Sequence, residues 1–245
     1  TFFSMGVCWY TIGLLYAPVV ADFGWGRGTY SIAISIFVVM QTLGSAPVGR
    51  MTDRWGPRRV MLFSVVLTGL SWALIAQVGL LGHRWVIWQF YLFCALLGLT
   101  SAGLGSVPVG ALIARWFTRK RGLAMGFAAI GAGLAGVLLA PLSAPFIAAY
   151  GWRALTWVLA ILTWVCCLPF TLWILRDDPA PWERPDGVIV SPVKPGVTVR
   201  QALRTAPFWI IGISYLAIQF GGSSVHMQAI PFLMDRGLTH QAASN

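Results

Sequence analysis

Long stretches of the chain contain no charged residue, and this spacing of charge constrains the fold more than any other feature. All of the charged residues, 17 basic and 7 acidic, fall outside seven charge-free segments. The segments are 1–21, 28–49, 60–83, 85–114, 122–152, 154–175 and 205–234. A helix needs about 20 apolar residues to cross the roughly 30 Å of hydrocarbon in a bilayer. The sequence therefore predicts an all-α membrane protein with seven membrane helices and the lipid bilayer as its surroundings.

The composition supports the same class. Hydrophobic residues make up 58% of the chain and charged residues 10%, whereas a soluble domain has about 25% charged residues. The net charge of +10 could suggest a nucleic-acid partner, but such a partner needs basic residues on one exposed face. Here the basic residues are divided among short loops, so we expect no nucleic-acid binding.

The distribution of Lys and Arg over alternate loops predicts the orientation. Thirteen lie in segments 50–59, 115–121 and 176–204, which fall on one side of the membrane, and four lie on the other. Loops rich in Lys and Arg stay in the cytoplasm. We therefore expect a multi-pass protein, of the bacterial cytoplasmic membrane, whose N-terminus is cytoplasmic.

The loop between the second and third charge-free segments, residues 49–59, reads GRMTDRWGPRR. Its glycines, aspartate and basic residues resemble the loop between helices two and three of the major facilitator superfamily, apart from the inserted Pro57. The resemblance implies a transporter of two six-helix bundles, and a cytoplasmic latch in which this loop braces one bundle against the other. Asp53 could pair with Arg54, Arg58 or Arg115, or lie near a helix N-terminus. The expected latch residues are Gly49, Asp53, Arg54, Gly56, Arg58, Arg59 and Arg115.

The ends of the sequence suggest a fragment of a twelve-helix transporter. Residue 1 is a threonine already inside apolar sequence, and an eighth helix could begin near Asn245. We interpret residues 1–175 as an N-terminal six-helix bundle and the proline-rich residues 176–204 as a cytoplasmic linker. Residues 205–245 would then begin a C-terminal bundle with helix seven, and the rest of that bundle would be the main partner.

A second resemblance indicates the substrate. The sequence ARWFTRKRGLAMGFAAIGAGLAG at 114–136, together with RDDPAPWERPDG at 176–187 and APFW at 206–209, is similar to the branch of monocarboxylate transporters and oxalate/formate exchangers. It implies transport of a small organic anion, a mono- or dicarboxylate, by proton symport or by exchange for a counter-substrate. A neutral or cationic solute, as in drug efflux, and a transport-inactive sensor are the alternatives.

The anion hypothesis needs a positive charge that these helices do not supply. A buried carboxylate requires a cation or several hydrogen-bond donors, and the seven segments contain no Lys or Arg. The animal monocarboxylate carriers use a lysine of the first helix for this purpose, where this sequence has Tyr10 and its neighbours. Either the cation comes from the second bundle or the substrate is not an anion.

Neutral polar side chains at membrane depth are the candidates for a substrate cavity. Helix seven carries two of them on one stripe, near a Gly221–Gly222 interruption that is typical of binding or gating sites. The alternatives are that Tyr10 is hydrogen-bonded within the bundle, and that His226 is satisfied by a neighbouring helix or lies near the outer interface. The candidates are Tyr10, Thr11, Gln41, Ser106, Gln219 and His226.

Two aromatic junctions on the side opposite the basic loops, residues 22–27 and 150–153, read DFGWGR and YGWR. Aromatic rings are enriched at the membrane–water interface. We therefore expect these junctions to anchor the helix ends.

Catalytic chemistry finds no support in the sequence. The cysteines Cys8, Cys94, Cys166 and Cys167 have no CxxC or histidine spacing, and no carboxylate lies within a charge-free segment. The GxGxxG of residues 131–136 lacks the strand of a dinucleotide fold, and a retinal protein would need a lysine in residues 205–234. We therefore predict a transporter, not an enzyme, without catalytic residues, cofactor or metal.

Overall fold

The computed structural model describes residues 6–79, 85–117, 120–177, 201, 203–210, 212–214 and 217. The chain forms two compact units, Thr1–Arg184 and Pro185–Asn245. All regular elements among the described residues are helical, as the sequence predicts. Five helical stretches of the described residues are long and apolar enough to cross a membrane: Arg27–Trp55, Pro57–Ala76, Val86–Trp116, Arg121–Leu139 and Pro141–Trp173.

The first predicted helix is broken into two short helices. They are α1 (Cys8–Leu14) and α2 (Tyr16–Phe23), separated at Leu15. Gly24 ends α2 in the left-handed conformation, with φ 64°, which glycine adopts without a steric penalty.

The second and third predicted helices are α3 (Arg27–Trp55) and α4 (Pro57–Ala76), and only Gly56 separates them. Gly56 has φ 86° and ψ 152°, a combination that is essentially restricted to glycine. Pro57 then opens α4, where its fixed φ suits the first helical position. The motif loop is therefore a single-residue turn with helix on both sides.

The fourth predicted helix is interrupted in its middle. It consists of α5 (Val86–Ser101), a 3₁₀ turn at Ala102–Leu104, and α6 (Ser106–Trp116). Gly105 is extended, with ψ −164°. The interruption leaves an internal helix N-terminus, that of α6, within an otherwise apolar span.

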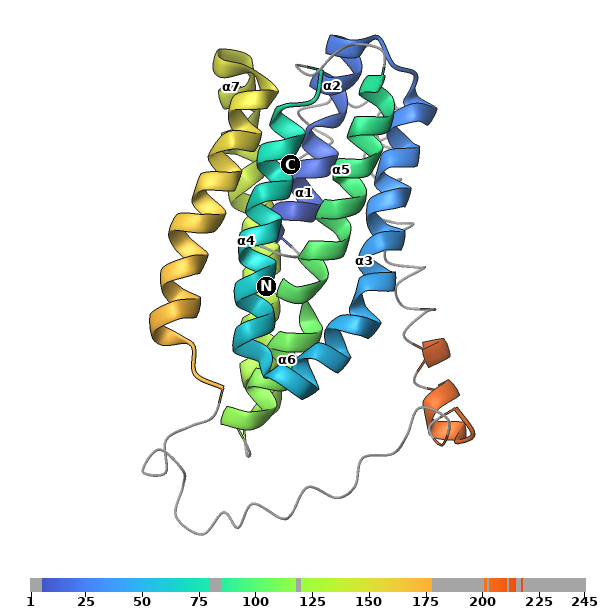
Figure 1. The fold of residues 1–245 in the computed structure, drawn as a ribbon, viewed down its shortest axis with the longest axis vertical. Coiled ribbons are helices and arrows are strands. Elements are labelled where there is room, and N and C mark those ends of the chain that lie inside the picture. The colour runs from blue at the N-terminus through green and yellow to red at the C-terminus, as the bar shows by residue number, and fades with distance from the viewer. Residues whose placement is uncertain are drawn as a thin grey trace, which may run out of the picture. The chain divides into compact units, whose positions relative to one another are not determined.

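The fifth and sixth predicted helices form α7 (Arg121–Pro169), in which the chain turns at Gly151, with φ 82°. Figure 1 shows the two arms of α7 running in opposite directions. A π-helical turn, Phe170–Ile174, follows the second arm.

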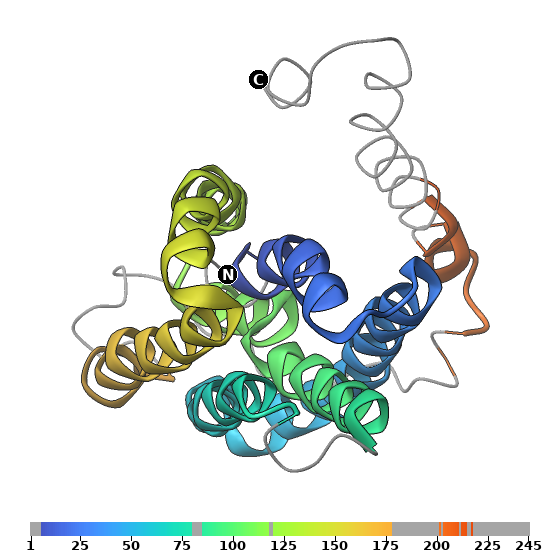
Figure 2. The ribbon, with the colours of Figure 1, turned by 90° about the horizontal axis from the view of Figure 1, so that it is seen from above.

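Figure 2 shows the helices of the first unit end-on, grouped side by side. Their buried apolar side chains form one large cluster and two smaller ones. The largest fully buried side chains of the large cluster include Trp72 of α4 and Tyr30 and Phe37 of α3. Gly98 of α5 faces the backbone of Phe37 so closely that a Cβ atom would collide with the Phe37 carbonyl oxygen. The close approach of α3 and α5 therefore depends on the absence of a side chain at Gly98.

In the second unit, residues 206–210 are helical. The Trp209 indole nitrogen donates to the Leu203 carbonyl oxygen at 2.9 Å. Phe208 and Trp209 make an edge contact, with ring centroids 5.6 Å apart.

Candidate functional site

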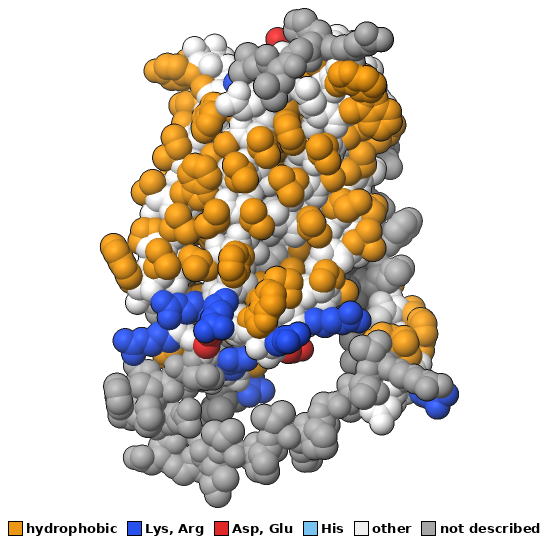
Figure 3. Space-filling model, viewed as in Figure 1, with side chains coloured by type: hydrophobic (Ala, Val, Ile, Leu, Met, Phe, Trp, Pro, Cys, Tyr) orange, Lys and Arg blue, Asp and Glu red, His pale blue; other side chains and the backbone are white. Residues whose placement is uncertain are grey.

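The basic residues gather at one end of the first unit, which we call the arginine-rich end. Figure 3 shows Lys and Arg as a band below apolar side chains that cover the helices. The described members of the band are Arg50, Arg54, Arg58, Arg59, Arg115, Lys120, Arg121 and Arg176. The predicted latch residues lie in this band.

The Asp53 carboxylate is exposed and makes no hydrogen bond or ion pair with any residue in the described part of the chain. Arg54 and Arg59 are exposed as well. Gly49 lies close to α6, because a Cβ atom added to Gly49 would be 3.8 Å from the side chain of Val107. Arg115 lies in the last turn of α6, where a cation interacts favourably with the helix dipole. Asp53 is therefore available to a partner outside the described residues.

Arg58 binds the end of the sixth predicted helix instead of Asp53. Its Nε donates to the carbonyl oxygen of Thr171 at 3.2 Å, and its Nη2 donates to that of Leu172. The backbone N–H of Arg58 donates to Oδ1 of Asp177 at 2.7 Å. A carboxylate at a helix N-terminus satisfies unpaired amides and interacts favourably with the dipole. Asp177 therefore closes the N-terminus of α4, a role that the sequence analysis did not assign to it.

Gly56 is the point where this carboxylate approaches the motif loop. A Cβ atom at Gly56 would lie 2.7 Å from Oδ2 of Asp177. Two physical features therefore favour glycine at position 56, the positive φ of its backbone and the short distance to the Asp177 carboxylate.

A second group of candidates lies on α1 and α3, at membrane depth. Tyr10 is 47% exposed and Trp9 is 41% exposed. The Tyr10 ring packs directly over Gly136 of α7, and its hydroxyl has no hydrogen-bond partner among the described residues. Thr11, the next residue, is only 1% exposed. Tyr10 therefore offers a hydroxyl on the surface of the bundle, whereas the neighbouring Thr11 faces the interior.

Gln41 joins three predicted helices through its amide. The Trp9 indole nitrogen donates to Gln41 Oε1 at 3.2 Å, and Gln41 Nε2 donates to the Ser101 hydroxyl at 3.1 Å. Ser101 in turn donates to the Gly98 carbonyl at 2.9 Å. The amide of Gln41 thus orients Trp9 and ties it to the last residue of α5, next to the helix interruption.

Ser106 is exposed and is the first residue of α6. The first amides of a helix have no partner within it, and the dipole gives that end a partial positive charge. In transporters, such half-helix N-termini at the membrane midplane face anionic groups. Tyr10, Gln41 and Ser106 thus lie in the first unit, whereas Gln219 and His226 lie outside the described residues.

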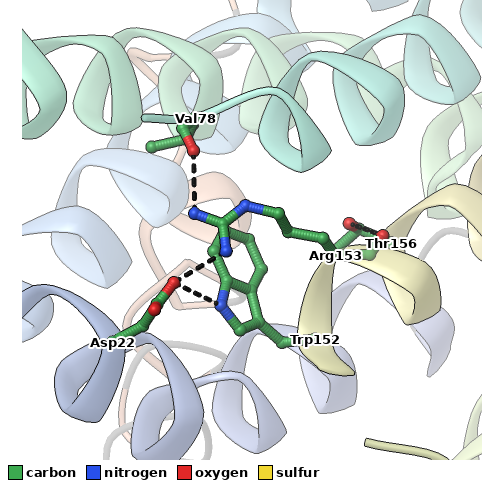
Figure 4. A network of polar contacts seen from close by, with 5 residues as sticks. All are labelled: Asp22, Val78, Trp152, Arg153 and Thr156. Atoms are coloured by element: carbon green, nitrogen blue, oxygen red, sulfur yellow. Dashed lines mark hydrogen bonds and ion pairs between the residues drawn. The ribbon is translucent and has the colours of Figure 1, made fainter. Parts of the chain in front are cut away.

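The opposite end of the unit is held by a cluster of aromatic and charged side chains (Figure 4). Nη1 of Arg153 donates to Oδ2 of Asp22 at 2.7 Å, and the Trp152 indole donates to the same oxygen at 3.1 Å. Nη2 of Arg153 donates to the Val78 carbonyl at 3.2 Å. The guanidinium also lies 4.3 Å from the centroid of the Trp152 ring, a favourable cation–π distance. The two aromatic junctions thus bind each other, which the sequence analysis did not predict.

The ionisation of Asp22 reflects these contacts. Burial raises the pKa of Asp22, but hydrogen bonds from Arg153 and Trp152 and the charge of Arg153 outweigh it. The pKa therefore lies below its ordinary value of 3.8, and the carboxylate is charged at neutral pH.

Within the described residues, no cluster of His, Cys, Asp or Glu could hold a metal ion. What the first unit offers chemically is hydrogen bonding, through Tyr10 and the α6 N-terminus, and a basic end. Tyr10 and the α6 N-terminus could bind a polar solute, and the basic end could form contacts that change between conformations.

Comparison with known proteins identifies one family and several relatives. A family model described as Major Facilitator Superfamily matches residues 1–244. Monocarboxylate transporter 13 of Bos taurus is 29% identical over 231 residues, which are 93% of this chain and 50% of that protein. The oxalate:formate antiporter of Oxalobacter formigenes is 25% identical over 227 residues, covering 91% of this chain and 51% of that protein.

A relative whose name indicates a different function matches a shorter part of the chain. Multidrug resistance protein MdtG of Klebsiella pneumoniae (strain 342) is 36% identical over 153 residues, or 61% of this chain and 34% of that protein. The chain spans about half the length of the first two relatives.

Proposed function

The chain belongs to the major facilitator superfamily, and from that premise we propose that it forms the first half of a secondary transporter for small organic anions. The substrates would be mono- or dicarboxylates, moved by proton symport or by exchange. The observation that carries the proposal is similarity over more than nine-tenths of the chain to a monocarboxylate transporter and an oxalate:formate antiporter. The protein is a multi-pass membrane transporter, and the proposal adds that its arginine-rich end faces the cytoplasm of a bacterial cell.

The hydrogen-bonding groups of α1 and α6 support an anionic substrate. The exposed hydroxyl of Tyr10 and the first amides of α6 can donate to a carboxylate at membrane depth. Because the charge-free segments contain no Lys or Arg, the proposal requires a fixed cation from the second bundle. A complete sequence without Lys or Arg in helices eight to eleven would rule out the carboxylate hypothesis.

The experiment measures solute uptake into liposomes that contain the purified full-length transporter. We expect protein-dependent exchange or proton-driven uptake of radiolabelled oxalate, formate or lactate, and no transport of a cationic dye such as ethidium. Liposomes without protein are the control for leakage. The similarity to MdtG favours drug efflux as the second candidate, which would be supported by ethidium transport without carboxylate transport. Binding of either solute without any transport would instead indicate a sensor.

A further inference from the structure

A groove lies at the arginine-rich end, between the last turns of α6 and the segment that follows the π-helical turn. Its volume is about 230 Å³. The lining is apolar except at one residue and consists of Leu112, Ile113, Trp116, Phe117, Leu175 and Arg176. The Trp116 indole donates to the Arg176 carbonyl at 3.0 Å, so this polar group is satisfied and ties the two walls together. The groove is therefore suited to hydrocarbon.

Two cations border this apolar groove. Arg176 is part of the lining. Arg121 lies beside the other wall, because its Nε donates to the Phe117 carbonyl at 2.6 Å and its Nη2 donates to the Ala114 carbonyl at 3.0 Å. Neither arginine forms an ion pair with an acidic residue in the described part of the chain. Asp177, which follows Arg176, binds the backbone N–H of Arg58 with its Oδ1. The positive charge beside the groove is therefore left uncompensated by the described residues.

The groove lies at the boundary between the apolar surface and the basic band. Leu175 and Arg176 directly follow the turn whose Thr171 carbonyl binds Arg58, so they share the level of the motif loop. At that depth a lipid places its phosphate beside basic side chains and its acyl chain against apolar ones. From this combination we propose that the groove is a binding site for one anionic phospholipid, with the phosphate at Arg121 and Arg176 and an acyl chain against Leu112 and Ile113. The site is independent of the transported solute.

The test is native mass spectrometry of the delipidated protein titrated with phosphatidylglycerol or phosphatidylcholine. We expect one phosphatidylglycerol to bind more tightly than phosphatidylcholine. Arg121→Gln and Arg176→Gln should each weaken phosphatidylglycerol binding about fivefold, since one basic residue near a lipid surface contributes about 1 kcal/mol. The matched control is Arg54→Gln, which removes an exposed arginine of the same band that is not part of the groove lining and should leave this affinity unchanged.

A second pair of variants distinguishes the contribution of the groove to lipid binding from that of the general positive charge of the band. Ile113→Trp, or the milder Ile113→Phe if the former does not fold, fills the groove without changing any charge and should also weaken phosphatidylglycerol binding. Equal affinity for the two lipids would overturn the proposal, as would an Arg54→Gln loss as large as that of Arg121→Gln. Unchanged affinity in the folded Ile113 variant would overturn it too, and is the result expected if another part of the chain covers the groove.

Discussion

Arg153 and Asp22 form an ion pair of 2.7 Å although 131 residues separate them in the sequence. The same guanidinium also binds the carbonyl oxygen of Val78. One side chain thus connects the ends of the first, third and sixth predicted helices. Because the side chain of Asp22 is 42% exposed, its solvation limits the contribution of the pair to stability, and measured values for exposed pairs are about 0.2–1 kcal/mol.

Asp22→Asn should lower the thermal stability of the detergent-solubilised protein in a pH-dependent way. The pKa of Asp22 is lowered from 3.8 in the folded protein. The stabilisation is therefore complete above that pH and is lost as the pH falls through the lower, folded-state pKa. We expect a reduced unfolding temperature at pH 7, by an amount equivalent to at most about 1 kcal/mol, and a smaller difference from wild type below pH 3.8. A difference that did not depend on pH would contradict the ion-pair explanation.

Gly56→Ala should destabilise the arginine-rich end more than Gly24→Ala destabilises the opposite end. Gly24 has φ 64° with nothing within 4 Å of its ideal Cβ, so alanine there costs only the left-handed backbone, about 1–2 kcal/mol. At Gly56 the backbone costs about 1–3 kcal/mol, and the new Cβ atom also meets Asp177. Thermal unfolding of both variants measures the difference.

A double-mutant comparison of Gly56 and Asp177 tests whether the contact with the carboxylate causes the extra destabilisation. In the Asp177→Ala background, Gly56→Ala should cost less than in wild type, because the carboxylate that the methyl group meets has been removed. Additive effects of the two substitutions would show that Asp177 does not constrain Gly56.

The sequence was sufficient to predict an all-helical membrane chain because charge is excluded from hydrocarbon whatever the packing. The two charge-free segments on either side of the motif are accordingly helical, but α3 and α4 extend through the charged residues of the motif and meet at Gly56. The interruptions at Leu15 and Gly105 were not predicted, because a break inside an apolar segment leaves no trace in the charge pattern. For Gly105, the signal that could have been used is the glycine itself, followed by Pro108 at a position that suits the first turn of a new helix.

The polar contacts were harder to predict than the helices. Arg58 was one of three arginines with which Asp53 was expected to pair, but its side chain binds the carbonyl oxygens of Thr171 and Leu172. The carboxylate at the α4 N-terminus is that of Asp177, which accepts from the Arg58 backbone N–H. Similarly, both aromatic junctions were recognised, but not the Asp22–Arg153 pair between them. Such pairs depend on which helices are neighbours in space, and the spacing of charge along one chain does not contain that information.

Asp53→Asn should reduce the turnover of transport, by about tenfold, and leave substrate affinity nearly unchanged. Its carboxylate is exposed and lies near the C-terminal end of α3, and we propose that it pairs with the second bundle in one conformation only. A tenfold loss corresponds to about 1.4 kcal/mol in the rate-limiting barrier. Initial uptake rates over a range of substrate concentrations would measure both parameters. Loss of affinity with normal turnover would place Asp53 in the substrate site instead, and Asp53→Glu, which keeps the charge, should retain more turnover than Asp53→Asn.

Cysteine substitution of two adjacent residues can test the proposed cavity. Tyr10 is 47% exposed on the bundle surface and Thr11 is 1% exposed. In a background without native thiols, Tyr10→Cys should therefore react with a water-soluble thiol reagent, and Thr11→Cys should not. The two positions share a helix and a depth, so they differ in the direction of the side chain and not in distance from the membrane surface.

The reaction should also respond to substrate. If Tyr10 donates a hydrogen bond to the transported carboxylate, saturating substrate should slow the labelling of Tyr10→Cys. Equal labelling of the two cysteines would mean that α1 moves or opens more than the structure indicates. No labelling of Tyr10→Cys from either side of the membrane would show that this face of α1 contacts lipid or protein, and the cavity would then have to be sought elsewhere, beginning at Ser106 and the α6 N-terminus.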